Sequence, residues 1–581
     1  MLRRVLIGAL FAGLAVIIAP AAWASSTQVL MPGVTYSRQV QFTAHGPVVI
    51  HVVTAPRPTG LYSLEPILAN GTITGRGRVT AMEKSVSAEA TVVGTNGDLF
   101  NWNDGHPTGI VLQGGIIKSP PYKDRSSIGI SDTGQLNVAR VALYGYWQGL
   151  GSRHPLSVNR VPRGDGTALF TPSWGARTPT MAGAFETVLE PFPPTITGEL
   201  DGTALAQATG GGTPIPRDGA VLFAIGSQAS KVATETTPPT VVHLQLVMAP
   251  NWPAQGINEA LGGGPVVVRN GRAVYTAGED FLASQLAPRN PRTGIGQRRD
   301  GKIVMVVVDG RRPGYSVGLT NFELAQAMVR LGVVTGSALD SGGSSTMAFD
   351  GQLLNRPSDR GGERAVKETL ALMYRGVYTP PLLLPVVSPA GGGLPSQETL
   401  TYKLVRPSTV KASIVGPDGT AAYDVTEAHL PGTYTVRWPT GTRSSRQQAL
   451  TPLGRWRWVV SATDDQAQQS SMERAFWVND TLGYLRVAPR AVHLRARARN
   501  QVVASFRLAH PATVVGTIMT KTGVLVRRIG PVKLGAGNRS FRWNGRFRSG
   551  RLAYRGAYVF QVFAKNSYGP VTLAQSFGVR R

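Results

Sequence analysis

Five short polar loops in this chain each follow an apolar run that predicts a β-strand. Their letters, in chain order, are NGDLFN, NPRTGIG, VDGRR, LDSGGSSTM and NRPSDRGGER. Carboxylates can transfer protons, guanidinium groups can bind an anion, and amides or small hydroxyls can hold sugar oxygens. We expect the loops to converge in one pocket. Its candidate residues are Asn96, Asp98, Asn101, Arg292, Thr293, Asp309, Arg311, Asp340, Ser344, Ser345, Thr346, Arg356 and Glu363.

Two of these loops follow predicted strands, and the segment between those strands predicts a helix. KIVMVVVDGR predicts a buried strand that ends at Asp309, and VTGSALDSGG predicts another that ends at Asp340. Between them, TNFELAQAMVRLGV predicts a helix with Thr320 and Glu323 as a capping box and Gly332 at its end. Parallel strands joined by a crossover helix bring their carboxyl ends to one sheet edge. We therefore expect Asp309 and Asp340 to lie close together.

The letters DSGG also surround the nucleophilic serine of trypsin-like proteases, which raises the question of whether Ser341 is a nucleophile. In the protease motif Gly precedes the Asp and Pro follows the glycines, whereas this chain has Leu339 and Ser344 there. A triad further needs a histidine base oriented by an acid, and no histidine here stands in the matching context. The sequence argues against a serine protease.

Metal chemistry has little support in the sequence. The chain has no cysteine and no two histidines at a ligand spacing, which argues against zinc. An all-oxygen Ca2+ site in the loop Asn101–Asp104 stays open beside the reading of that loop as a plain turn. No cofactor is certain, and the metal ligands stay unknown.

The five loops together resemble those of the phosphodiester glycosidases, the family of N-acetylglucosamine-1-phosphodiester α-N-acetylglucosaminidase. Members of that family commonly read NGDFF, NPRTAIG, VDGR, DGGGSSTM and NRPSDGGGER, in the same order. The resemblance spans roughly residues 33–374. It implies hydrolysis of a sugar–phosphate diester at the glycosidic side, which releases a free sugar and a phosphomonoester.

The resemblance also implies roles for individual residues. Arg292 and Arg311 are assigned to the phosphate. Asp98, Asp309 and Asp340 are the base or nucleophile candidates, with Glu363 in reserve. The groups expected to hold sugar or phosphate oxygens are Asn96, Asn101, Thr293, Ser344, Ser345, Thr346 and Arg356. This chain departs from the family with Leu99, Ser341 and Arg360, where Phe, Gly and Gly are commoner.

The two ends of the chain predict export and an anionic partner. MLRR, an apolar run from Val5 to about Ala19 and then Ala22-Trp23-Ala24 predict a signal peptide over residues 1–24, with a retained anchor as the alternative. The formal net charge is +27, and residues 481–581 contain no Asp or Glu. For an exported protein this favours an anionic wall polymer or membrane surface over nucleic acid.

These patterns predict a domain order and a fold class. A signal peptide (1–24) precedes a phosphodiester glycosidase domain (25–375), for which we expect an α/β (mixed α+β) fold with a mixed sheet. A Pro/Gly-rich linker (376–397) follows. Two all-β immunoglobulin-like sandwiches (398–480 and 481–581) come last, the second resembling the immunoglobulin-like module of flagellar hook-cap proteins.

We therefore expect a secreted or cell-envelope hydrolase that cleaves a sugar-1-phosphodiester in a glycan or envelope polymer. Two alternatives remain open. One is a non-catalytic glycan-binding protein of the same fold. The other is a hydrolase of wall teichoic acid or exopolysaccharide phosphodiesters with no activity on small substrates. The sugar, the anomer and the oligomeric state do not follow from the sequence.

Overall fold

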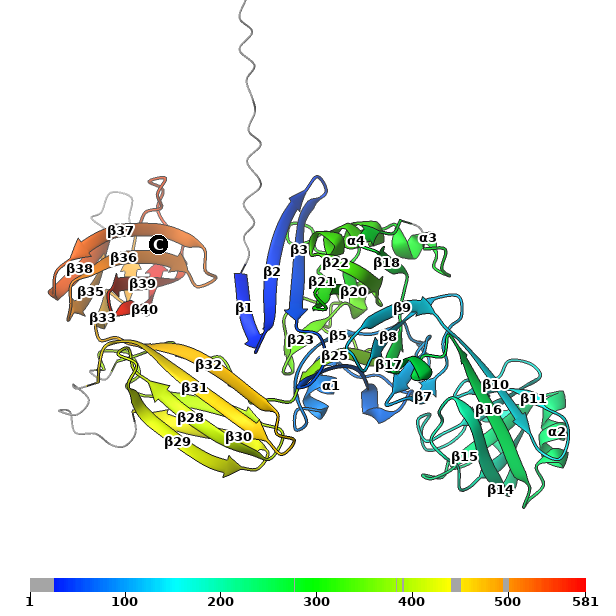
Figure 1. Ribbon diagram of the computed structural model, residues 1–581. Helices are drawn as coiled ribbons and strands as arrows, with labels where there is room; N and C mark the ends of the chain where they lie inside the picture. Colours follow the sequence, from blue (N-terminus) through cyan, green and yellow to red (C-terminus); the bar gives the residue numbers. More distant parts are fainter. Residues whose placement is uncertain are drawn as a thin grey trace, which may run out of the picture. The chain divides into compact units, whose positions relative to one another are not determined.

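The computed structural model describes residues 26–275, 277–382, 384–388, 391–439, 451–494 and 501–580 (Figure 1). The predicted signal peptide lies outside the described residues. The chain forms two compact units, which divide close to residue 372. Unit 1 contains all five polar loops, and unit 2 contains the C-terminal β-strands. The predicted domain boundaries stay predictions.

An eight-stranded antiparallel sheet forms the largest layer of unit 1. Its central strand β21 is buried at every position, as its run of Val and Ile favours. In spatial order the strands are β1 (Ser26–Met31), β2 (Val34–Thr43), β3 (Gly46–Ala55), β21 (Ile303–Val308), β20 (Arg292–Arg298), β22 (Val333–Ala338), β18 (Val266–Arg269) and β19 (Arg272–Ala273).

Helix α4 (Asn321–Arg330) joins β21 to β22 and packs on this sheet. Its N-cap is Thr320, whose hydroxyl accepts from the Glu323 N–H while the Glu323 carboxylate accepts from the Thr320 N–H. Leu324 and Met328 point from the helix into the core beneath. Gly332 follows with φ +84°, so the predicted capping box and helix end are confirmed.

The prediction of an α/β catalytic domain with a mixed sheet is wrong, because unit 1 is built almost wholly of β-strands. Strand β20 lies between β21 and β22 and pairs antiparallel with both. The helix therefore crosses over a strand that comes from earlier in the chain. The described residues contain only four short α-helices, which are α1 (Val79–Ser85), α2 (Ser227–Glu235), α3 (Ala283–Leu286) and α4. None of them is long and apolar enough to cross a membrane.

A closed seven-stranded barrel is formed by residues 142–249, from the middle of the sequence of unit 1. Its interior is filled by apolar side chains, with Trp147 and Leu169 fully buried among them. Around the barrel the strands are β10 (Ala142–Gln148), β11 (His154–Val158), β12 (Gly166–Phe170), β15 (Ala220–Ile225), β13 (Thr180–Leu189), β14 (Gly198–Gly211) and β16 (Val241–Ala249).

Unit 1 also contains two five-stranded sheets, the first of which carries the remaining polar loops. The first contains, in order, β24 (Gln352–Leu353), β23 (Met347–Phe349), β5 (Thr91–Asn96), β25 (Glu368–Tyr374) and β4 (Tyr62–Leu68). The second contains β7 (Ile116–Ser119), β6 (Val111–Gln113), β17 (Ile257–Gly262), β8 (Ser126–Ser131) and β9 (Leu136–Arg140). The end of β5 supplies the buried Asn96, the start of β25 supplies the buried Glu368, and the end of β17 supplies Gly262.

Unit 2 contains two hydrophobic cores, each enclosed by two sheets. The first lies between the sheet β26 (Val386–Val387), β32 (Gln469–Val478), β31 (Gly454–Asp464), β28 (Ser408–Val415), β29 (Ala421–His429) and the pair β27 (Glu398–Leu404), β30 (Gly432–Trp438). The second lies between β33 (Leu482–Ala488), β35 (Val502–Leu508), β38 (Gly537–Trp543) and the sheet β34 (Ala491–His493), β40 (Gly569–Arg580), β39 (Gly556–Asn566), β36 (Ala512–Thr520), β37 (Leu525–Leu534).

Candidate functional site

The side chain of Asn96 joins three of the five polar loops. Asn96 ends the buried strand β5 and is itself fully buried. Its Nδ2 donates to the backbone oxygen of Asp340 over 2.8 Å. Its Oδ1 accepts from Thr293 Oγ1 at 2.8 Å and from the Thr346 N–H at 3.1 Å. The predicted convergence of these loops is therefore present in the structure.

Beside Asn96 lies a buried pair of carboxylates, Asp98 and Glu368. The Asp98 N–H donates to Glu368 Oε1 at 2.5 Å, and Asp98 Oδ2 accepts from the Gly109 N–H at 2.8 Å. A side chain at Gly262 would collide with Asp98 Oδ2, and one at Gly97 would collide with Glu368. Glycine at these positions lets the backbone close around the two acids.

Burial makes both acids hard to ionise. It raises the pKa of Asp98 to about 7, against the backbone N–H groups of Leu99 and Gly109, which lower it. Burial and then the charge of Asp98 raise the pKa of Glu368. Burial also raises the pKa of Asp340. Among the residues described, Asp98 Oδ1 and Glu368 Oε2 have no hydrogen-bond partner, so each carboxylate keeps one buried oxygen that is unsatisfied within the protein.

Asp98 lines a crevice that is too narrow to hold a water molecule, and this crevice shares Thr108 and Tyr122 with a cavity of about 720 Å³. The cavity is lined by basic and polar groups, among them Arg160, Arg163 and His106. Arg160 donates to the carbonyls of Thr108 and Pro120 at 3.1 and 3.3 Å, which fixes it at the wall. A carboxylate with a pKa near neutrality therefore lies next to a cavity with cationic walls.

Trp102 is an aromatic side chain in a neighbouring loop, and it is 60% exposed. The guanidinium carbons of Arg364 and Arg76 lie 5.1 and 5.6 Å from its ring centre. Arg364 also donates to Ser344 Oγ at 3.3 Å and forms an ion pair with Asp359 at 2.8 Å. Trp102 thus connects through Arg364 to the loop that carries Asp340, and its exposed ring can stack on a sugar.

Asp309 occupies a separate polar cluster. Its Oδ2 contacts His51 Nε2 at 3.0 Å and accepts from the Tyr315 hydroxyl at 2.8 Å. Its Oδ1 accepts from Asn355 Nδ2 and from the Arg356 N–H at 3.0 and 3.1 Å. Burial alone would raise the pKa of Asp309, but the hydrogen bond and charge of His51, with the other donors, lower it. Asp309 and Asp340 end strands on either side of β20, about 10 Å apart at the normal strand spacing.

Arg292 and Glu363 are engaged by the protein itself. All five N–H groups of the Arg292 guanidinium point to protein oxygens, namely the carbonyls of Leu319, Gln285, Leu286 and Pro288 and the Ser341 hydroxyl. Glu363 accepts from the N–H and the hydroxyl of Thr80, next to the start of α1. Arg292 therefore has no unused donor in this structure, whereas the half-buried Glu363 carboxylate keeps acceptor capacity, and both predicted roles stay predictions.

The other predicted residues divide by exposure. Arg311 is exposed, donates to Asn290 Oδ1 at 3.0 Å and lies against Gly342, so it keeps donors for an anion. Arg356 is exposed over the ring of Tyr315. Ser345 Oγ and Thr346 Oγ1 are buried without a hydrogen-bond partner in the described ranges. Asn101 lines the large cavity.

The loop Asn101–Asp104 forms a turn whose oxygens are in use. Asn101 Oδ1 accepts from the Asn103 N–H at 2.8 Å, and Asp104 Oδ1 accepts from the His106 N–H and contacts His106 Nδ1 at 2.6 Å. Within the described residues no group of three or more His, Cys, Asp or Glu could hold a metal ion. The loop contains one carboxylate, that of Asp104, and no step below depends on a metal.

Several functional candidates were missed by the sequence reasoning. Glu368 carried a usable signal, because it opens the otherwise apolar strand ETLALMY directly after Lys367. Both residues are fully buried, and Lys367 Nζ donates to the carbonyls of Thr72, Thr74 and Gly75. Arg160, on a distant barrel segment, carried no such signal.

Comparison with known proteins finds a family match that includes four of the five polar loops. Residues 196–373 match the family model described as "Phosphodiester glycosidase". Over 68 residues the chain is 37% identical to the N-acetylglucosamine-1-phosphodiester alpha-N-acetylglucosaminidase of Bos taurus, which covers 12% of each protein. Over 91 residues it is 41% identical to the SPbeta prophage-derived uncharacterized protein YomE of Bacillus subtilis, which covers 16% of this chain and 14% of that protein.

A solved structure resembles a larger part of the chain. The crystal structure of a hypothetical protein from Synechocystis matches with a TM-score of 0.52 and 25% identity, over 61% of this chain and 64% of that one. Residues 196–373 are thus similar to the phosphodiester glycosidase family, which supports a phosphodiester glycosidase-like function. The sequence matches span only about an eighth of each named relative's length, so the activity of the whole protein is a separate question.

Proposed function

We propose that unit 1 hydrolyses a sugar-1-phosphodiester of the N-acetylglucosamine-phosphodiester kind, within a glycan or a cell-envelope polymer. The observation that carries the proposal is the junction at Asn96, which binds the loops of Thr293, Asp340 and Thr346 beside the buried acid Asp98. These are motif loops of the phosphodiester glycosidase family, and they enclose a group suited to proton transfer.

Asp98 is the base of the hydrolytic step. Its ionised form takes a proton from water as the water oxygen bonds to the sugar C1. The bond between C1 and the phosphate oxygen breaks, and the electron pair leaves with the phosphomonoester. The products are a free sugar and that phosphomonoester. A phosphate leaving group needs little protonation, so one acid–base group near neutrality is sufficient.

Cationic and aromatic groups on separate loops of unit 1 hold the two halves of the substrate in this proposal. Arg163 lines the cavity and Arg311 is exposed, and in this proposal both bind the charged phosphodiester. The exposed ring of Trp102 stacks on the sugar. Ser345 and Thr346 offer buried hydroxyls without partners in the described residues, which can bind ligand oxygens.

The place of action is the second part of the proposal. We propose that the protein is exported and remains at the cell envelope, on the basis of the N-terminal sequence pattern. Residues 481–581, which lack Asp and Glu, attach it to an anionic polymer or surface there.

A substrate panel tests the catalytic proposal. The full chain and its Asp98→Asn variant are incubated with sugar-1-phosphodiesters, and free sugar and phosphomonoester are measured separately. We expect both products in equal amounts from the wild type and almost none from the variant. Binding of the same compounds without turnover would replace the enzyme with a non-catalytic glycan-binding protein.

A further inference from the structure

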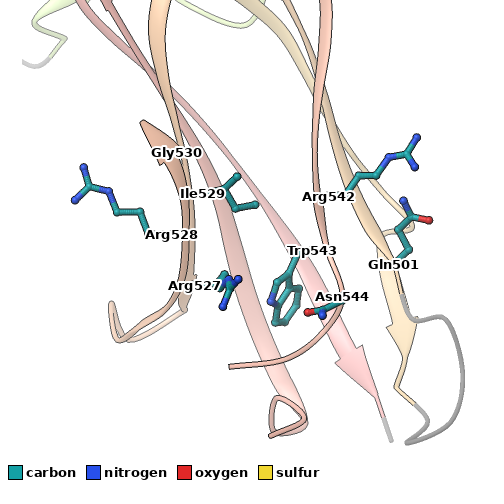
Figure 2. Close-up of a pocket in the computed structure, with 8 residues that line it drawn as sticks. All are labelled: Gln501, Arg527, Arg528, Ile529, Gly530, Arg542, Trp543 and Asn544. Atoms are coloured by element: carbon teal, nitrogen blue, oxygen red, sulfur yellow. The ribbon is translucent and has the colours of Figure 1, made fainter. Parts of the chain in front are cut away.

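The second core of unit 2 has an open, basic side (Figure 2). A cleft of about 520 Å³ there is lined by Gln501, Arg527, Arg528, Ile529, Gly530, Arg542, Trp543 and Asn544. Its two walls are β37 and β38, which are the end strands of the two sheets. In Figure 2, Arg528 and Arg542 extend on opposite sides of the cleft, and Arg527 and Trp543 lie between them.

Arg527 takes a position that normally belongs to an apolar residue. It pairs across the strands with Ile518, which is fully buried in the core. Directly paired residues point to the same face of a sheet, so Arg527 faces the inner side, yet it is exposed. A charged group on an inner face costs free energy unless water or a counter-charge reaches it. The cleft gives it that access.

The arginines of this cleft have no counter-charge of their own. In the described part of the chain, Arg527, Arg528 and Arg542 form no ion pair or side-chain hydrogen bond. Residues 481–581 contain 19 Lys and Arg and not one Asp or Glu, so no carboxylate side chain of that segment can neutralise them. Their donors remain available to an external anion.

The floor of the cleft is apolar and fixed. The Trp543 ring is 2% exposed, and its N–H donates to the Arg546 carbonyl at 2.9 Å. Because that donor is used, the floor offers contact area rather than a hydrogen bond. The amides of Gln501 and Asn544 stand at the rim, where they can meet uncharged polar groups.

We propose that this cleft, which we call the Arg527 cleft, binds the phosphate groups of an extended polyanionic chain. Guanidinium groups bind phosphate oxygens with paired hydrogen bonds; here that of Arg527 lies between the two walls, and those of Arg528 and Arg542 flank the groove. A single flexible chain can enter the groove and reach the recessed Arg527, whereas a flat bilayer meets only its rim. The inference deepens the proposed attachment to an anionic partner and is independent of hydrolysis.

The test is binding of long-chain polyphosphate to the full chain at several salt concentrations. Arg527→Gln is compared with Arg486→Gln, which removes the same charge from β33 at the far edge of the three-stranded sheet. We expect Arg527→Gln to weaken binding by about fivefold or more, with a salt dependence lower by about one ion. Arg486→Gln should change the affinity less than about twofold.

Three results would overturn the proposal, and each contradicts a different part of it. No binding by the wild type removes the anionic partner altogether. Equal losses in both variants mean that only the net charge acts and that Arg527 merely protects an open strand edge from pairing. Retention on phosphatidylglycerol vesicles that depends on Arg527, without polyphosphate binding, assigns the cleft to a membrane. Thermal unfolding of both variants checks that the fold is retained.

Discussion

Two aspartates of unit 1, Asp98 and Asp309, follow buried β-strands in the same way but have opposite surroundings. Asp309 is contacted by four polar groups, and its pKa is lowered. Asp98 has one unpartnered oxygen and two glycines against it, and its pKa is raised to about 7. The number of donors that reach each carboxylate, rather than its depth, decides whether it stays charged.

This difference separates a structural acid from a reactive one. A carboxylate with all its lone pairs occupied holds loops together, and it has no free position for a substrate proton. A desolvated carboxylate that has an oxygen without a hydrogen-bond partner is unstable in its charged form, which favours proton uptake. We expect substitutions to show the two roles independently.

The largest effect is expected on activity. Asp98→Asn removes the proton acceptor and should lower kcat by about 10²–10⁴-fold, which is the usual contribution of general acid–base catalysis. In the wild type, kcat/KM should fall as the pH drops below about 7, because Asp98 becomes protonated. Activity that survives Asp98→Asn, with the same pH profile, would give the role to another group.

The next effect concerns stability and its dependence on pH. Since the folded pKa of Asp98 lies above its unfolded value, ionisation destabilises the native state as the pH rises from about 4 to 7. At pH 8 the free energy of unfolding of Asp98→Asn should therefore exceed that of the wild type by up to about 4 kcal/mol. This difference, measured by chemical denaturation, should vanish near pH 4. The exposed control Asp218→Asn should show no such trend.

Asp309→Asn should lower the free energy of unfolding, in contrast to Asp98→Asn. Its loss leaves His51 and the Tyr315 hydroxyl without their acceptor, and we expect a cost of about 3 kcal/mol at pH 7. The folded pKa of Asp309 is lowered, so the cost should shrink as the pH falls below about 4. Chemical unfolding at several pH values measures it. A stable Asp309→Asn protein without activity would make Asp309 a reactive group as well.

The smallest predicted effect is on substrate binding by the exposed aromatic ring. Trp102→Ala should raise KM by about fivefold with little change in kcat, as expected for loss of one stacking contact. Tyr144→Ala, which removes a similarly exposed ring from the barrel, is the matched control. Equal effects of the two substitutions would deny Trp102 a role in the sugar site.

The sequence predicted the meeting of three polar loops but not the fold class. The motif loops could be placed together because their letters occur in one order, and Asn96 confirms the meeting of three of them. The roles within the loops were harder, because whether Arg292 is free depends on carbonyls of residues 285–288 and 319 that a motif does not reveal. The strand order was missed because β20, the strand immediately before β21 in the chain, lies between β21 and β22.

The barrel has a further consequence. Its first and last strands begin and end at directly paired residues, since Ala142 lies opposite Ala249. The polypeptide therefore leaves the surrounding sheets and returns to them at a single point. An inserted domain has this geometry. Loops of the barrel can lengthen or shorten while the pairing of β10 with β16 at the point of insertion stays in register. Variation of the barrel's outer loops is thus a route by which such a chain could acquire new substrates without rebuilding the acids of its centre.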